Sequence, residues 1–427
     1  MAGGAKAVQA EGHRVVIARA ESLEHRSFWH RISSPRSIGI AGIGAGILAL
    51  WLALPPVTVR TPPGPVALGV VAVAAGIWAF ARGERRLGGG AAAAGVIGIA
   101  GALAAMQAQT SNLSIVFTWS LLIAATLRWS TPLTFAALGG LFSERSGVVN
   151  IALEGMMLMG AFFGAYGADK THSWIGGVVI GVASGAALAL LYAFFAIHLR
   201  IDQIVGGTAI NFLAFGITGY LYNDIYGNNG TPSNLPGVPN VRLHWLGHIP
   251  AVGNFLDNSI GAMNLMIWIG IALVPISWFV LFKTATGLRI RSVGEHPRAA
   301  EAVGISVYAT RYAAVTLSGV LAALGGVFLS IGYVGSFGEN LTGGRGFIAL
   351  AALIFGGWKP FGAFAACLLF GFSSALAQHL PDLTQNQAAA WPVLFQALPY
   401  VLTLIAVAGI IGRAVAPAAD GQPYEKQ

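Results

Sequence analysis

The sequence predicts an all-α integral membrane protein, a polytopic helical bundle of about 10–12 transmembrane segments, some of them discontinuous. Three observations lead to this fold class. Hydrophobic residues make up 56% of the 427 residues and charged residues only 9%, against roughly 25% charged in an ordinary soluble domain. The mean hydropathy is +0.70. Apolar runs of about 20 residues, the length that crosses a bilayer core, recur along the chain.

Short polar stretches divide the apolar sequence into a series of predicted helices. Two apolar runs, 132–142 and 346–357, are too short to cross a membrane alone, and each is followed by a polar break and a further apolar run. Residues 113–130 are expected to lie along the membrane interface, since their Trp and Arg side chains suit the headgroup level. The predicted apolar segments are 37–54, 65–81, 88–108, 132–142, 147–167, 174–197, 204–222, 263–283, 312–331, 346–357, 361–378 and 391–412.

The polar ends and the basic residues define the predicted domains and orientation. We predict a cytoplasmic N-terminal tail at 1–36, N-terminal transmembrane helices at 37–110, a core at 111–412 and a cytoplasmic C-terminal tail at 413–427. With the N-terminus inside, most of the 24 Lys and Arg residues fall on the inner side, as the positive-inside rule requires. The net charge of +8 is then an orientation signal, and a nucleic-acid-binding face is excluded. The outer basic residues are Arg60, Arg128, Lys170, Arg242 and Arg345.

Two long polar connections interrupt the predicted core. The connection 226–262 falls outside and is rich in Asn, Gly and Pro, so it is either a docking loop for an external partner or a plain connecting loop. The connection 283–311 falls inside. Within it, Pro297 suits the first position of a short helix that ends near Gly304. A helix this short is unstable alone in water, and a groove on a cytoplasmic partner would give it a surface to pack on.

Polar side chains gather at two places within apolar sequence. In the run 143–155, Asn150 and Glu154 are four residues apart and would share one helix face. They either line a polar cavity or pair structurally with another helix, because charges at membrane depth are costly without partners. The run 337–347 combines glycines with aromatic and polar residues, which suits either a small polar ligand or an outer loop that closes the bundle. Asn211 lies in another span and either bonds across helices or lines the path.

Small residues and an internal repeat add to this picture. Gly177, Gly181 and Gly185 recur at four-residue spacing and predict a helix face for close packing. The stretches 136–147 and 351–362 share an Ala-Ala-Leu triplet and a later glycine at one constant offset. Paired discontinuous helices of this kind indicate a transport site near the middle of a membrane.

The sequence gives no support for an enzyme. It contains no phosphate-binding loop, no His-Glu-x-x-His, no Gly-x-Ser-x-Gly and no clustered histidines with carboxylates. The single cysteine, Cys367, excludes a disulfide framework and a multi-cysteine metal site. We therefore predict no catalytic residues, no metal and no directly bound cofactor.

Three runs resemble the permease subunits of bacterial ATP-binding-cassette (ABC) importers, in the nucleoside and simple-sugar branch that is related to branched-chain amino acid and ribose permeases. The resemblance covers roughly residues 130–412. The runs are LFSERSGVVNIALEGMMLMGA (141–161), GLRIRSVGEHPRAAEAVGI (287–305) and GRGFIALAALIFG (344–356).

This resemblance implies a transport complex in the bacterial cytoplasmic (inner) membrane. A periplasmic or lipid-anchored binding protein would deliver the substrate, and a second permease subunit, usually a different chain, would complete the pathway. Separate ATPase subunits would bind ATP and drive transport. The coupling loop of the family maps onto Gly294, Glu295, His296, Pro297, Ala300 and Gly304. The candidate residues of the substrate pathway are Ser146, Asn150, Glu154, Asn211, Phe337, Asn340 and Phe347.

Three functions follow from these observations. The first is an ABC importer permease for a small polar solute. The expected solute is a nucleoside, and the alternative is a simple sugar such as ribose. The second is an ion-coupled secondary transporter, for which Glu154 is the reasonable titrating acid. The third is a membrane enzyme, which lacks a catalytic constellation. The loop at 283–311 favours the first.

Overall fold

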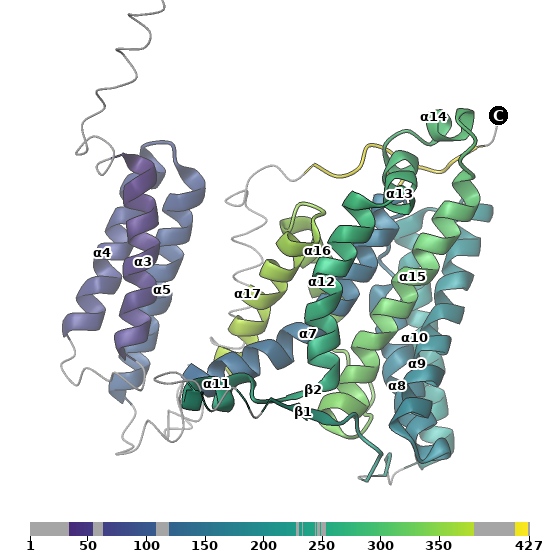
Figure 1. The fold of residues 1–427 in the computed structure, drawn as a ribbon, viewed down its shortest axis with the longest axis horizontal. Helices are drawn as coiled ribbons and strands as arrows, with labels where there is room; N and C mark the ends of the chain where they lie inside the picture. The colour runs from purple at the N-terminus through teal and green to yellow at the C-terminus, as the bar shows by residue number, and fades with distance from the viewer. Residues whose placement is uncertain are drawn as a thin grey trace, which may run out of the picture. The chain divides into compact units, whose positions relative to one another are not determined.

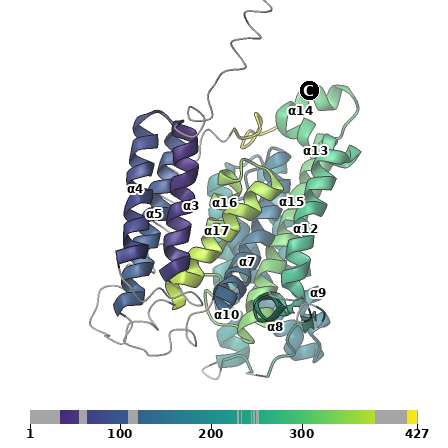
Figure 2. The same cartoon turned by 60° about the vertical axis from the view of Figure 1, so that its left-hand side comes forward.

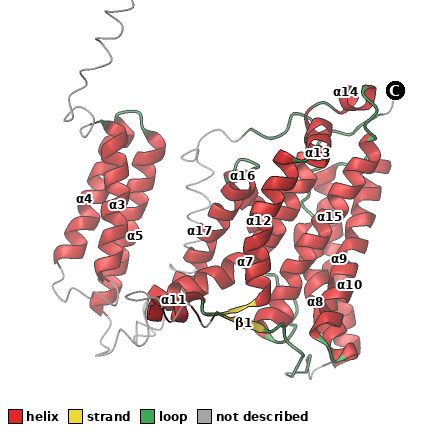
Figure 3. Cartoon of the chain, in the orientation of Figure 1, coloured by secondary structure: helices red, strands yellow, loops and turns green. Residues whose placement is uncertain are grey.

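The computed structural model describes residues 34–53, 63–107, 119–227, 230–232, 234–243, 245, 248, 253–379 and 415–425. Helices dominate these residues (Figure 3). The chain divides into two compact units, Met1–Ser114 and Ile115–Gln427. The predicted segment 391–412 lies outside the described residues.

The first unit contains three apolar helices side by side, α3 (Pro35–Ala53), α4 (Pro63–Ala81) and α5 (Arg85–Gln107) (Figures 1 and 2). Glycines allow their backbones to approach closely. A Cβ on Gly46 of α3 would lie 2.7 Å from the Ala94 Cβ of α5. A Cβ on Gly95 of α5 would lie 2.7 Å from the Gly69 carbonyl oxygen of α4. Small residues thus replace bulky side chains as the packing surface, as is common between membrane helices.

The second unit is a larger bundle that carries all the candidate site residues. Its helices α13 and α14 lie at one end, which we call the α14 end, while α11 and the strands β1 and β2 lie at the other, the β1–β2 end (Figure 1). Its helices are α7 (Trp119–Arg145), α8 (Leu153–Thr171), α9 (Trp174–Ala193), α10 (Gln203–Tyr226), α11 (Gly253–Ile260), α12 (Leu265–Lys283), α13 (Ala285–Glu295), α14 (Pro297–Ala302), α15 (Val307–Val327), α16 (Arg345–Phe355) and α17 (Pro360–His379), with π-helical turns η1 (Phe194–His198) and η4 (Phe328–Val334).

Six helical stretches of the described residues are long and apolar enough to cross a membrane, and four shorter apolar helices accompany them. This confirms the predicted all-α polytopic fold. One of the shorter helices is α16, which confirms the short segment predicted at 346–357. The turn 356–359 separates α16 from α17, as the polar break predicts.

The prediction was wrong for the neighbourhood of Pro132. Instead of an interfacial stretch followed by a short span, one 27-residue helix, α7, runs through this region. Pro132 lacks an N–H, so the Arg128 carbonyl four residues earlier loses its helical donor. Membrane helices tolerate such a proline where the surrounding bundle compensates, and Pro132 is buried. The hydroxyls of Thr131 and Ser130 bond to the Leu127 carbonyl at 2.6 and 3.1 Å.

The glycine face predicted on α9 is confirmed. Gly177, Gly181 and Gly185 are all buried. A Cβ on Gly181 would lie 2.8 Å from the Gly160 carbonyl oxygen of α8 and 2.5 Å from Val327 Cγ2 of α15. Three helices therefore meet at close range along this stripe.

At the β1–β2 end, β1 (Asn240–Arg242) and β2 (Ala262–Asn264) form an antiparallel pair with Val241 opposite Met263. The pair is anchored to the end of the π-helical turn η4, where the last carbonyls have no partner within the helix. The Val238 N–H donates to the Ile331 carbonyl at 3.0 Å, and Asn264 Nδ2 donates to the Gly332 carbonyl at 3.1 Å. The connection 226–262 is thus a packed structure in its described part.

Candidate functional site

The backbone leaves the helical path between α7 and α8, at residues 146–152, and most of this break is buried. Backbone groups away from water need partners, and here neighbouring helices supply them. Gln203 Oε1 of α10 accepts from the Val149 N–H at 2.7 Å. The Tyr192 hydroxyl of α9 donates to the Val149 carbonyl. Side chains from two other helices therefore hold the break in place.

Asn211 of α10 joins the break to the start of α8. Its Nδ2 donates to the Ile151 carbonyl at 2.9 Å, while its Oδ1 accepts from the Gly155 N–H at 2.7 Å. The sequence left two roles open for Asn211, a bond across helices or a place on the substrate path. These two hydrogen bonds match the first role. Ser146 is fully buried, and its hydroxyl donates to the Ser143 carbonyl at 2.7 Å.

Asn150 lies inside the break and is completely buried. Its Nδ2 donates to Ser318 Oγ of α15 at 2.8 Å. Its Oδ1 has no hydrogen-bond partner among the described residues. Buried polar atoms in native proteins are nearly always paired, so this oxygen can accept one more hydrogen bond. The expectation that Asn150 shares a helix face with Glu154 was wrong, because α8 begins only at Leu153.

Glu154, in the first turn of α8, binds the loop that precedes α16. Its Oε1 accepts from the Thr342 hydroxyl at 2.6 Å and from the Gly344 N–H at 2.8 Å. Its Oε2 accepts from the Gly346 N–H at 2.5 Å. The negative charge thus lies at the N-terminus of α16, where unpaired N–H groups and the helix dipole favour an anion. This loop and α8 are therefore tied together by one buried carboxylate.

The aromatic candidates of the run 337–347 differ in exposure. Phe337 is buried at 3% exposure and packs edge-on against Phe162, with ring centroids 5.2 Å apart. Phe347 is 48% exposed, and Asn340 is exposed in a left-handed conformation with φ of 54°. The structure therefore gives Phe337 a packing contact, while Phe347 and Asn340 remain accessible. The assignment of these residues to a substrate pathway stays a prediction.

The α14 end contains the two short helices of the predicted coupling loop. Pro297 occupies the first turn of α14, and Gly304 follows the helix with φ of 85°, which confirms the predicted helix. Ala300 faces inward at 3% exposure, whereas Val303 is 76% exposed. Glu295 lies 4.0 Å from Arg145 at the end of α7. The loop thus has one face on the bundle and one face free.

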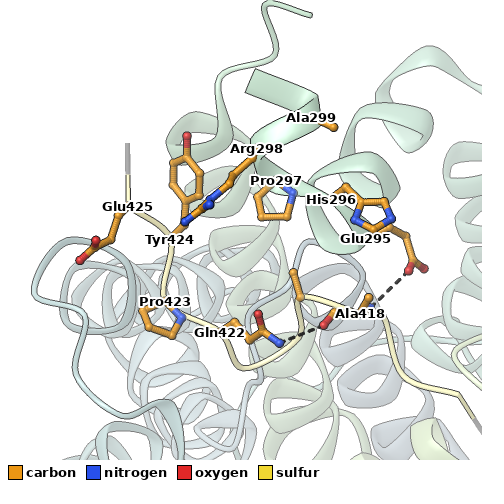
Figure 4. A pocket seen from close by; sticks show the side chains of 11 residues that line it. Glu295, His296, Pro297, Arg298, Ala299, Ala418, Gln422, Pro423, Tyr424 and Glu425 are labelled. Atoms are coloured by element: carbon orange, nitrogen blue, oxygen red, sulfur yellow. Dashed lines mark hydrogen bonds between the residues drawn. The ribbon is translucent and has the colours of Figure 1, made fainter. Parts of the chain in front are cut away.

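The C-terminal segment 418–425, which we call the strap, lies against this loop. The Ala419 N–H donates to the Gly294 carbonyl at 2.9 Å, and the Ala418 N–H donates to Glu295 Oε2 at 3.2 Å. Tyr424 donates a hydrogen bond to Glu301 of α14 and packs edge-on against a neighbouring tyrosine of α15. The strap and the coupling loop therefore form one surface (Figure 4).

A buried arginine connects the strap to the break between α7 and α8. Arg311 of α15 is 2% exposed, and its guanidinium donates to the Ser146 carbonyl at 3.2 Å and to the Gln422 carbonyl at 3.1 Å. Burial raises the pKa of Asp420 in the strap from 3.8 to about 7, although Arg311 and the N–H of Gly421 act to lower it. The buried carboxylate of Glu144 lies within electrostatic reach of Asp420.

Several of these residues were not identified from the sequence. Gln203, Tyr192 and Ser318 stabilise the break, yet all three are far from it in sequence. Tyr192 and Ser318 lie in largely apolar runs, and Gln203 follows Asp202 at the start of α10. The indole N–H of Trp358 donates to the Glu144 carboxylate at 2.6 Å, which links the two polar breaks of the internal repeat. The Arg145 guanidinium also donates to the Trp358 carbonyl at 2.7 Å. The internal repeat, which pairs these two breaks in the sequence, is the feature from which this contact could have been predicted.

This bundle, with a buried break held by side chains and two short helices at one end, defines a multi-pass membrane protein of the transporter class. More specifically, the chain belongs to the family described as the permease component of branched-chain amino acid transport systems, whose profile matches residues 122–407. It is a transport subunit and not itself an enzyme. No solved structure matches the chain.

Three relatives are informative. A guanosine ABC transporter permease protein, NupQ of Bacillus subtilis, is 42% identical over 323 residues, 74% of this chain and 99% of the relative. A nucleoside ABC transporter permease protein, NupC of Lactococcus lactis subsp. cremoris, is 39% identical over 324 residues, with the same two shares. A putative glucose ABC transporter permease protein, TsgC13 of Haloferax volcanii, is 34% identical over 288 residues, 66% of this chain and 85% of the relative.

Proposed function

We propose that this chain is the transmembrane permease subunit of an ATP-driven importer for nucleosides. The observation that carries the proposal is the similarity to two relatives, described as guanosine and nucleoside permeases, that match across 99% of their length. The short helices at the α14 end support it, because they present a free face outside the long apolar helices. The protein resides in the bacterial cytoplasmic membrane with both termini in the cytoplasm.

The α14 end is then the cytoplasmic end, and it meets an ATPase subunit that hydrolyses ATP. A second permease subunit, most simply a different chain, completes the pathway, and a periplasmic or lipid-anchored binding protein docks at the β1–β2 end. Substrate would pass near the break 146–152, where the free acceptor of Asn150, buried in this conformation, would offer a hydrogen bond once the pathway opens. Phe347 and Asn340 supply an accessible aromatic ring and a polar group at the other candidate loop.

A simple sugar is the second candidate substrate, and the similarity to a putative glucose permease favours it. The two substrates share the hydroxyl-rich ring that hydrogen-bonding side chains recognise. Only a nucleoside adds a flat base that can stack on an aromatic side chain.

Uptake by right-side-out or reconstituted vesicles, with the ATPase side facing the lumen, tests the proposal. Vesicles contain this chain with or without the ATPase, second permease and binding protein encoded beside it, and ATP is supplied on the ATPase side. Labelled guanosine, adenosine, uridine, ribose and glucose are compared. We expect nucleoside uptake that requires ATP and all partners. Sugar uptake alone would correct the substrate, whereas uptake by the chain alone with an ion gradient would refute the importer.

A further inference from the structure

The surface at the α14 end has two parts that lie far apart in the sequence. The coupling loop supplies Glu295, His296, Pro297, Arg298 and Ala299, and the strap supplies the opposite wall. Between them is a pocket of about 630 Å³ (Figure 4). The pocket exists only because the strap is present, since its lining on that side consists of Ala418, Ala419, Gln422, Pro423, Tyr424 and Glu425.

Specific contacts fix the strap beside α14. Two backbone N–H groups of the strap bond to the end of α13, and the Tyr424 hydroxyl bonds to Glu301 of α14. The Tyr424 side chain is itself buried, at 5% exposure, in an apolar cluster with Val293, Ala300 and Val307. A helix of six residues has little stability of its own. The strap therefore sets the orientation in which α14 is presented.

The charges around the pocket are unequally paired. Glu425 forms a salt bridge of 2.6 Å with Arg200, and Glu295 lies 4.0 Å from Arg145. Arg298 is exposed and has neither an ion pair nor a hydrogen bond within the described part of the chain. Its guanidinium is a planar group that binds a carboxylate well through two parallel hydrogen bonds. The pocket thus presents the positive charge of Arg298, which has no acidic partner among the described residues, beside the apolar rings of Pro297 and Pro423.

We propose that the strap and α14 together form the docking surface for the ATPase subunit, and that the pocket between them accepts an acidic side chain of that subunit at Arg298. The inference rests on the proposed function, because it needs an ATPase partner at this end. It adds that the C-terminal segment is part of the docking surface, and it names the charge that the partner must present. The strap acts as a positioning element, and Arg298 makes the contact.

Binding of the purified, adjacently encoded ATPase subunit to the detergent-solubilised permease complex tests the inference. Arg298→Glu should lower the affinity at least tenfold, since it places like charges together, whereas Arg298→Lys should retain most of the binding. Arg85→Glu is the matched control. It makes the same change in net charge at an exposed position of α5, outside the coupling loop, the strap and the pocket lining, and should change affinity less than threefold.

The strap is tested separately with Tyr424→Ala and Tyr424→Phe, neither of which changes the charge of the protein at neutral pH. Tyr424→Ala should weaken ATPase binding at least fivefold by releasing α14, and Tyr424→Phe should have a smaller effect because the ring still packs. Val415→Ala, at a position 80% exposed and outside the pocket lining, is the control. Size-exclusion profiles confirm that each variant is folded.

The outcomes separate this inference from the proposed function. If the wild-type complex binds the ATPase and transports, but Arg298→Glu and Tyr424→Ala bind as tightly as the wild type, the docking surface is wrong and the function stands. Equal losses in Arg298→Glu and Arg85→Glu would mean general charge repulsion and would also overturn the docking surface. If the wild-type complex binds no ATPase, the proposed function fails together with the docking surface.

Discussion

The carboxylate of Glu154 connects α8 to the loop before α16, and its replacement by glutamine gives the sharpest test of the bundle. Glutamine has nearly the same shape but no charge. Its amide oxygen can keep the bonds from Thr342 and Gly344, but its amide nitrogen then faces the Gly346 N–H, and two donors oppose each other.

The magnitude follows from the three bonds. A hydrogen bond to a charged group contributes about 1.5–3 kcal/mol and a neutral one about 1 kcal/mol. Glu154→Gln removes one charge-assisted bond and weakens two, so we expect a loss of about 3 kcal/mol in the free energy of unfolding. Glu154→Ala leaves all three donors unpaired, and we expect about 5 kcal/mol, at about 1–3 kcal/mol for each buried unsatisfied group.

The assay is thermal and denaturant unfolding of the purified protein in a mild detergent. Glu339→Gln is the matched control, because Glu339 is exposed and accepts one hydrogen bond, from Asn223 at 2.7 Å. Its change should stay below about 0.5 kcal/mol, as for most surface substitutions. A Glu154→Gln protein as stable as the Glu339→Gln protein would refute the reasoning. Lost uptake with unchanged stability would instead place the carboxylate on the substrate.

Three further predictions concern packing and the strap. Gly181→Leu should prevent close approach of three helices and lower the yield of monodisperse protein, whereas Gly216→Leu, where a Cβ meets nothing within 4 Å, should not. Burial raises the pKa of Asp420 from 3.8 to about 7, so the bound strap favours the protonated acid. The strap is held most tightly below the lower value and loosens as the pH rises from there to about 7. A spin label on Val415→Cys should report this as growing mobility, and Asp420→Asn should abolish the pH dependence. Arg311→Met removes the guanidinium bond to the Gln422 carbonyl, one of the contacts that hold the strap, so the same label should be more mobile than in the wild type at every pH; unchanged mobility would contradict this anchoring role.

Within the described residues, the sequence predicted a helix at each long apolar run with clear polar ends. It also located α14, because Pro297 and Gly304 are local signals for the two ends of a helix. It failed at Pro132, where α7 continues through a proline that is buried in the packed bundle. That packing arises only in the folded protein, and local helix propensity does not predict it.

The candidate site was predicted less completely. The run 143–155 was identified because its polar residues interrupt apolar sequence, and the structure shows how that interruption is stabilised. The partners Gln203 and Ser318 come from helices distant in the sequence, so no local pattern relates them to the break. The strap was interpreted as a polar tail, because its contact with the coupling loop arises only when the chain folds back on itself.

The attachment of the β1–β2 end to η4 has a consequence for variation of the chain. The Val238 N–H and the Ile331 carbonyl are main-chain groups, as are the Leu265 N–H and the Pro239 carbonyl that bond at 3.0 Å nearby. Any residue except proline can supply such a donor, and any residue can supply the acceptor. Apart from Asn264, whose side chain also bonds to η4, the side chains on the outer strands can therefore be exchanged, by evolution or by design, without detaching them from the bundle. This end can be adapted to a new external partner while the helices beneath it keep their sequence.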